Sequence, residues 1–214
     1  MPEDKELDEA PVVTATPNTA ATVAAPASRF DDLVFKICAS GDTTALAKLL
    51  DKEPQLLTEV DPVSGGTLAH WCALHGRLLL IKLLQERGAA LDACIEENGM
   101  QPVHWACSRG HLATTQYLIC IAGIPADVPD AAGTTPLMHA AQGNHPRLVF
   151  WLGTTYPDCL PKVDNNGDTA LHWAACASTA AEPTFALVCT DRPHGTTVAF
   201  ARRQGLAHGS DTPL

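Results

Sequence analysis

The chain repeats one phrase four times at a period of 34 residues. The copies read GGTLAHWCA, GMQPVHWAC, GTTPLMHAA and GDTALHWAA, and they begin at Gly65, Gly99, Gly133 and Gly167. Each glycine suits a turn that needs a positive φ, and the Thr or Pro that follows suits the start of a helix. A constant period of this length predicts a stack of similar small units, each packed on its neighbours.

The phrase matches the T-P-L-H-x-A core of ankyrin repeats, in which a β-turn precedes two antiparallel helices. We therefore expect an all-α ankyrin-repeat solenoid, built of helix–turn–helix repeats of 34 residues joined by β-turns. The expected units are a divergent first repeat at 30–64, repeats at 65–98, 99–132 and 133–166, and an incomplete repeat at 167–180. Residues 1–29 are predicted to be a disordered acidic tail rich in Ala, Thr and Pro, and residues 181–214 an irregular tail. Pro183 would interrupt the second helix of the incomplete repeat.

The charge of the chain restricts its partners. The net charge of −10 argues against nucleic-acid binding, which favours a basic face. Residues 1–32 contain seven acidic and two basic groups, so about half of this charge lies outside the repeats. The sequence has no apolar run of about 18 residues that could cross a membrane, and its start is not a signal peptide. We expect a soluble, cytoplasmic protein.

The histidines and cysteines resemble metal ligands at first sight. His70, His104 and His172 occupy the histidine position of the repeat, so they should lie about 10 Å apart along the stack, too far apart to share one zinc ion. The eight cysteines form no C-x-x-C motif, and Cys72 and Cys107 fall at small buried positions, as expected for reduced structural thiols. We expect no metal, no cofactor and no catalytic residue in this chain, because no catalytic motif is present.

One position in the repeat carries large rings. Trp71, Trp105 and Trp173 follow the repeat histidine, and His139 takes this place in the remaining copy. The rings could simply pack between helices, or they could form an aromatic strip that anchors an extended peptide. Because ankyrin stacks commonly bind proteins along their groove, we predict a protein-interaction module with these four residues as candidate contacts.

The His-Trp phrase, at 70–71, 104–105 and 172–173, together with Pro136-Leu137-Met138, resembles the ankyrin domain of the DHHC-type protein S-acyltransferases, the palmitoyltransferases. The resemblance covers about residues 65–176. It implies recruitment of substrate proteins through a groove tryptophan, which Trp105 matches, and a nearby polar residue, at which this chain has His75 where the family has asparagine. It also implies a position at the cytosolic face of Golgi or other membranes. The Asp-His-His-Cys motif of those enzymes is absent from this sequence. The alternative function is therefore the substrate-recruiting portion of such an enzyme, with the catalytic part missing from this chain.

Overall fold

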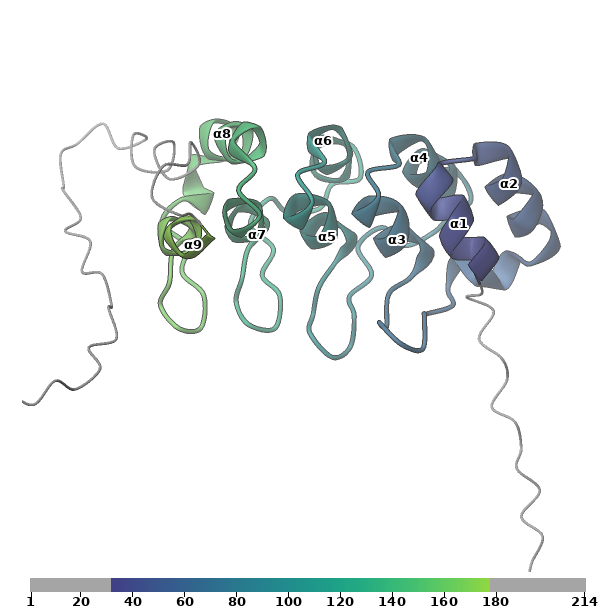
Figure 1. Cartoon of the computed structure of the whole chain (residues 1–214), viewed down its shortest axis with the longest axis horizontal. Helices are drawn as coiled ribbons and strands as arrows, with labels where there is room; N and C mark the ends of the chain where they lie inside the picture. The colour runs from purple at the N-terminus through teal and green to yellow at the C-terminus, as the bar shows by residue number, and fades with distance from the viewer. Residues whose placement is uncertain (1–31, 178–214) are drawn as a thin grey trace, which may run out of the picture.

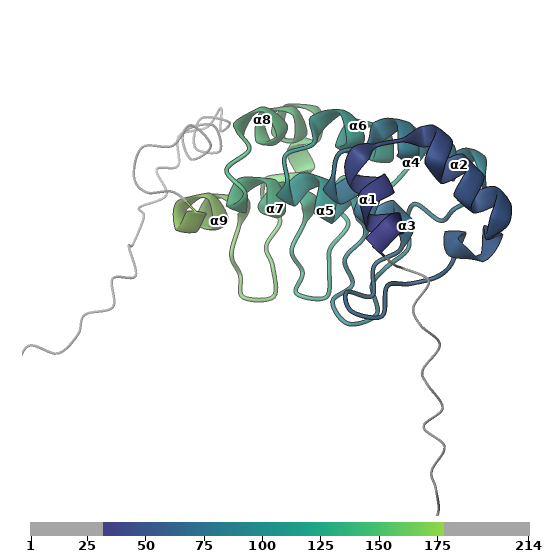
Figure 2. The ribbon, with the colours of Figure 1, turned by 45° about the vertical axis from the view of Figure 1, so that its right-hand side comes forward.

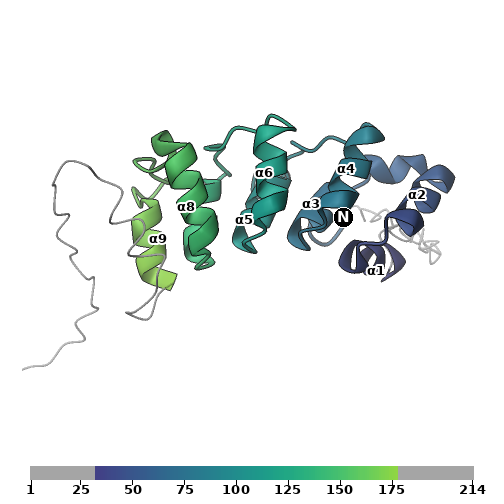
Figure 3. The same ribbon diagram turned by 90° about the horizontal axis from the view of Figure 1, so that it is seen from above.

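The computed structural model describes residues 32–177 and arranges their helices in two rows (Figures 1 and 3). The first row contains α1 (Asp32–Ser40), α3 (Leu68–Leu74), α5 (Pro102–Ser108), α7 (Pro136–Gln142) and α9 (Ala170–Ala177). The second row contains α2 (Thr43–Lys52), α4 (Leu78–Glu86), α6 (Leu112–Cys120) and α8 (Pro146–Thr155), with short 3₁₀ turns at η1 (Pro54–Leu57) and η2 (Pro157–Cys159). No strand occurs between residues 32 and 177, so the prediction of an all-α repeat stack is confirmed. The predicted tails at 1–29 and 181–214 lie outside the described residues.

The helices begin where the sequence provides a cap. Asp42 precedes α2, and its Oδ1 accepts hydrogen bonds from the backbone N–H groups of Thr44 at 2.9 Å and Ala45 at 3.0 Å. Pro102 and Pro136 open α5 and α7, at a position where a helix has no use for a backbone N–H. The two prolines therefore explain why α5 and α7 start at equivalent positions of the repeat.

The core runs through the stack as a continuous apolar layer. Leu80, Leu118 and Leu152 of the second row are fully buried against the first row. Small side chains, such as those of Ala106 and Ala140, are also fully buried, and they allow neighbouring first helices to approach closely. Each repeat therefore depends on its neighbours to exclude water from its apolar face.

Two of the repeat histidines, His70 and His104, join their repeat to the next one. Nδ1 of His70 accepts from the backbone N–H of Thr67 at 3.1 Å, and its Nε2 donates to the carbonyl of Met100 at 3.1 Å. His104 makes the equivalent contacts with the N–H of Gln101 at 2.9 Å and the carbonyl of Val128 at 3.0 Å. Both ring nitrogens are therefore occupied in hydrogen bonds that hold the fold, and the contacts require the neutral tautomer with the proton on Nε2.

A second histidine series makes the same kind of cross-repeat contact from the start of the second helix. Nε2 of His111 donates to the carbonyl of Leu74 at 2.8 Å, and Nε2 of His145 donates to the carbonyl of Ser108 at 2.9 Å. Each ring lies against a glycine of the preceding repeat. A Cβ on Gly110 would lie 2.5 Å from Nδ1 of His145. Glycine is therefore needed there for space as well as for its φ of +73°.

The turns before the first helices form fingers that project from the stack (Figure 2). We call these loops fingers one to four, at residues 61–66, 95–100, 130–134 and 164–168; the first and last residues of each are joined by a backbone hydrogen bond. Neighbouring fingers are also connected, since the N–H of Ala131 donates to the carbonyl of Asn98 and the N–H of Asn165 donates to that of Ala132, both at 2.9 Å. The fingers and the first helices together border the groove described below.

Candidate binding groove

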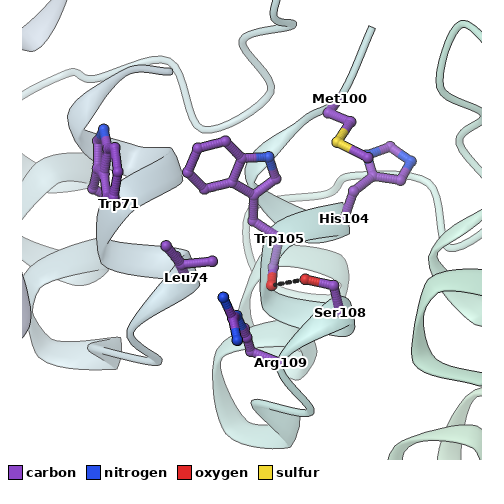
Figure 4. A pocket seen from close by; sticks show the side chains of 7 residues that line it. All are labelled: Trp71, Leu74, Met100, His104, Trp105, Ser108 and Arg109. Atoms are coloured by element: carbon purple, nitrogen blue, oxygen red, sulfur yellow. Dashed lines mark hydrogen bonds between the residues drawn. The ribbon is translucent and has the colours of Figure 1, made fainter. Parts of the chain in front are cut away.

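A pocket of about 310 Å³ opens between α3 and α5 beside finger two (Figure 4). Its lining consists of Trp71, Leu74, Met100, His104, Trp105, Ser108 and Arg109. The two tryptophans lie on neighbouring helices, while Met100 comes from the finger. The pocket is thus largely apolar, with the guanidinium of Arg109 at one side.

Trp105 is held in place by the repeat before it. Its ring meets the ring of Trp71 edge to face, with centroids 5.5 Å apart, and that of His70 at 5.3 Å. Finger one contacts the far edge of the indole, since a Cβ on Gly66 would lie 3.2 Å from Cη2 of Trp105. Trp105 is half-buried, so a rigid ring is fixed on one side and open to the pocket on the other.

Trp71 completes an aromatic row that reaches α1. Its ring packs edge to face on Phe35 at 4.6 Å, in addition to its contact with Trp105. The indole Nε1 of Trp71 is buried and has no hydrogen-bond partner among the described residues. An unpaired buried donor costs free energy, so the aromatic contacts must hold this ring in place.

The other two ring positions have a different environment. Nε2 of His139 lies 3.1 Å from Oδ2 of Asp130, and Nε1 of Trp173 donates to Oδ2 of Asp164, also at 3.1 Å. His139 is only 7% exposed. The structure therefore brings Trp71 and Trp105 together in the pocket, whereas His139 and Trp173 are joined to fingers three and four.

The lengths of the fingers account for this difference. Fingers three and four begin at Asp130 and Asp164 and close over four residues, whereas fingers one and two begin at Asp61 and Ile95 and close over five. Finger two thus begins with an apolar residue, Ile95, whereas fingers three and four begin with an aspartate. Asp61 accepts from the hydroxyl of Ser64 at 2.6 Å, within its own finger. The longer fingers leave both pocket tryptophans without an aspartate partner.

His75 lies one helical turn beyond Trp71, as the C-cap of α3, and is half-buried. Burial lowers its pKa below the usual value, and the nearby charges of Arg77, His111 and Arg109 lower it further. Arg77 donates to the carbonyl of Ala39, while Arg109 is exposed and has no ion pair within residues 32–177. The end of the groove beyond the two tryptophans is therefore locally cationic.

A second cavity, of about 540 Å³, lies between fingers three and four. Pro125, Val128 and Val163 supply its apolar walls, and an ion pair between Lys162 and Asp127, 3.0 Å long, borders it. Although this cavity is larger, it contains none of the ring residues that were predicted as contacts and no aromatic side chain. We take the smaller, aromatic pocket as the candidate site because rigid aromatic side chains are favoured at protein-binding sites.

Other kinds of site find little support in the part of the chain that the structure describes. No group of three or more His, Cys, Asp or Glu side chains there could hold a metal ion. The described cysteines are free thiols, and burial raises the pKa of Cys107 to about 12, which makes that thiol a poor nucleophile. Between residues 32 and 177, no helix has the length and apolar character required to span a bilayer.

The family model of ankyrin repeats in many copies matches residues 69–119 and 104–152. The human protein "Ankyrin repeat domain-containing protein SOWAHD" is 34% identical over 100 residues, covering 44% of this chain and 32% of that protein. "Palmitoyltransferase Hip14" of Drosophila melanogaster is 36% identical over 138 residues, covering 61% of this chain and 21% of that protein. "Palmitoyltransferase AKR1" of Lachancea kluyveri is 27% identical over 142 residues, covering 64% of this chain and 19% of that protein.

The chain thus spans about a fifth to a third of the length of these relatives. The similarity to two palmitoyltransferases confirms the resemblance seen in the His-Trp phrase. It concerns their sequences, at modest identity. The 34-residue period, the paired helices and the family match together show that residues 69–152 form ankyrin repeats, and the chain is similar in sequence to part of two palmitoyltransferases.

Proposed function

We propose that the chain is a protein-interaction module that binds an extended peptide segment of a partner protein in the groove between the first helices and the fingers. The observation that carries this proposal is the pocket between Trp71 and Trp105. A peptide side chain of moderate size fits a cavity of about 310 Å³, and the indole of Trp105 already lies in a fixed orientation. A rigid aromatic wall binds at a low cost in side-chain entropy.

The four ring positions have unequal roles in this proposal. Trp71 and Trp105 would contact the apolar anchor of the peptide, and His75 would contact a polar group next to it. His139 and Trp173, which are bonded to finger aspartates, would serve mainly to keep the later fingers upright beside the peptide. Partner binding therefore centres on the N-terminal half of the groove.

Selection of peptides from a random display library against the full chain tests the proposal. We expect selected peptides to bind the Trp105→Ala variant at least about 30-fold more weakly, the effect of losing a contact worth about 2 kcal/mol. Trp151→Ala is the matched control, because Trp151 is also half-buried but lies in the second row, on Tyr156. We expect its affinity for peptide to stay within about twofold of the wild type, since it removes no groove contact.

Two results would contradict the proposal. One is the failure of any peptide to be selected above background. The other is a loss of about 3–5 kcal/mol of folding stability in Trp105→Ala, with peptide binding unchanged in the fraction that is folded. That result would identify Trp105 as a core residue, which is the packing interpretation of the aromatic row.

A second candidate function rests on the similarity to palmitoyltransferases. In this version the groove recruits a substrate protein for S-palmitoylation by a catalytic part that this chain lacks, on the cytosolic side of a membrane. Sequencing of the transcript beyond the codon for residue 214 tests it. An open frame encoding membrane helices and an Asp-His-His-Cys motif would support this candidate. A stop codon directly after that codon in every transcript would refute it.

A further inference from the structure

The cationic end of the groove stands out in an otherwise acidic protein. Residues 33–176 contain fourteen acidic and nine basic groups. Yet two arginines, Arg77 and Arg109, lie close enough to His75 for their charges to lower its pKa. The guanidinium of Arg109 also borders the aromatic pocket and has no ion pair within the described residues. This end of the groove therefore has the charge that an acidic segment would complement.

The chain itself contains such a segment. Residues 3–9 read EDKELDE, in which five of the seven side chains are acidic and one is basic. The segment is followed by Ala10, Pro11 and two valines, so apolar side chains adjoin the acids. The acidic side chains of this segment complement the cationic end of the groove, and the apolar side chains that follow them suit its aromatic pocket.

The segment is long enough to reach the groove. Residues 10–31 separate it from α1, and 22 residues can span at most about 70–80 Å. The path from α1 to Arg109 is short by comparison. Phe35 of α1 contacts Trp71, Trp71 contacts Trp105, and Arg109 lies about one helical turn of 5.4 Å beyond Trp105. Because the segment is tethered, its effective concentration at the groove is high without any need for tight binding.

We propose that the acidic segment at residues 3–9 docks on the cationic end of the groove, at Arg109 and Arg77, with the following Pro and Val residues at the Trp71–Trp105 pocket. The segment then acts as an intramolecular competitor of the peptide partner. A partner must displace it, so the affinity of the groove depends on the charge of the tail. This inference goes beyond the proposed function but rests on the same groove being a binding surface.

Cross-linking in the full chain tests the contact without any partner. The variant Arg109→Lys places an amine at the groove, and a carbodiimide joins an amine to a carboxylate only where the two are in contact. Arg147→Lys is the matched control, because Arg147 is exposed on α8 in the second row. We expect cross-links from the carboxylates of residues 3–9 to the amine introduced at position 109, at least about fivefold more than to that at position 147, as charge complementarity predicts.

Two outcomes of the cross-linking would overturn the proposal. Equal yields in the two variants would show that the segment has no preference for the groove. The second outcome is a cross-link between two copies of the chain, which a mixture of ¹⁵N-labelled and unlabelled chains detects. Cross-linked peptides that contain one labelled and one unlabelled half would show that the tail of one copy docks on another copy. Disappearance of the position-109 cross-links in high salt is expected, since exposed ion pairs are screened.

Neutralisation of the tail tests the competition. Replacing Glu3, Glu6 and Glu9 with Gln, and Asp4 and Asp8 with Asn, should strengthen binding of a display-selected peptide about two- to tenfold, the size expected for a few exposed ion pairs. Unchanged affinity would refute the competition. The two proposals, peptide binding in the groove and docking of the tail, can be refuted independently. If position 109 is cross-linked to the tail but no peptide is selected, only the proposed function is refuted. Tryptophan-dependent peptide binding without position-109 cross-links would refute only the docking of the tail.

Discussion

The indole of Trp173 donates its N–H to Oδ2 of Asp164 at 3.1 Å, and thereby joins α9 to finger four. His139 makes the corresponding contact with Asp130 in finger three, 34 residues earlier. The side chains of both aspartates are nearly buried, so each needs a polar partner to offset the loss of water. The same repeat position therefore supports the fold in the later repeats, while Trp105 faces a pocket in the earlier one.

This difference predicts unequal effects of one substitution. Trp173→Phe removes the donor of a nearly buried carboxylate, and should reduce the free energy of unfolding by about 1–3 kcal/mol. Trp71→Phe removes an N–H that has no partner among the described residues, and should cost less than about 1 kcal/mol. Urea unfolding of both variants measures the contrast. A larger loss in Trp71→Phe than in Trp173→Phe would contradict this assignment.

The glycines that follow the helices allow a similarly matched comparison. A Cβ on Gly110 would lie 2.5 Å from the His145 ring, so Gly110→Ala should break the bond from His145 to the Ser108 carbonyl. Gly88 also has a positive φ, of +82°, but a Cβ added there would have nothing within 4 Å, so Gly88→Ala isolates the backbone strain. We expect Gly88→Ala to cost about 1 kcal/mol and Gly110→Ala at least about 2 kcal/mol more.

Thermal unfolding of the two alanine variants gives the comparison. Equal melting temperatures would mean that the His145 ring can move without loss of its hydrogen bond. In that case the cross-repeat histidine would contribute little to the coupling of neighbouring repeats.

The 34-residue period and the caps allow the helices to be predicted from the sequence alone. Pro102 and Pro136 identify the starts of α5 and α7, because proline suits the first position of a helix. The pairing of Trp71 with Trp105 can also be expected, since equivalent positions on neighbouring first helices lie side by side. The period does not reveal that fingers one and two are one residue longer than fingers three and four. Because the glycines are evenly spaced, the sequence gives no sign that Ile95 begins finger two at the position where Asp130 and Asp164 begin the later fingers.

The cationic surroundings of His75 are also beyond the reach of sequence reasoning. Arg77, Arg109 and His111 come from two repeats, and only the stacking brings their charges near one another. In the sequence, single basic residues in separate repeats do not indicate that they lie on one surface. The acidic segment, in contrast, is plain in the sequence, but only the fold reveals a surface of opposite charge within its reach.

The buried repeat histidines predict a loss of stability in mild acid. Burial lowers the pKa of His70 and of His104 to about 4, whereas an unfolded chain has histidine pKa values of about 6.5. The unfolded state therefore binds more protons between these values, so stability is highest above pH 6.5 and falls as the pH drops towards 4. From pH 7.5 to 5, each histidine should cost about 2 kcal/mol.

Urea unfolding at the two pH values measures this loss. His104→Gln provides the control, because glutamine can still hydrogen-bond but does not titrate. Its loss of stability between pH 7.5 and 5 should be smaller than that of the wild type by about 2 kcal/mol. An unchanged pH dependence would show that His104 does not resist protonation in the folded protein.

The thiols of the chain should differ in reactivity according to their burial. Among the described cysteines, Cys38, Cys72, Cys107 and Cys159 are buried, whereas Cys94, Cys120 and Cys176 are exposed. Burial raises the pKa of Cys107 to about 12 and that of Cys159 to about 11, so these two should remain protonated at neutral pH. In a Cys189→Ser variant, which removes the cysteine outside the described residues, we expect three thiols to react rapidly with a disulfide reagent and four only on unfolding. Mass spectrometry of the labelled peptides identifies them. Rapid labelling of Cys107 would contradict its burial beside Thr115 of α6, because a buried thiol reacts only when the stack opens.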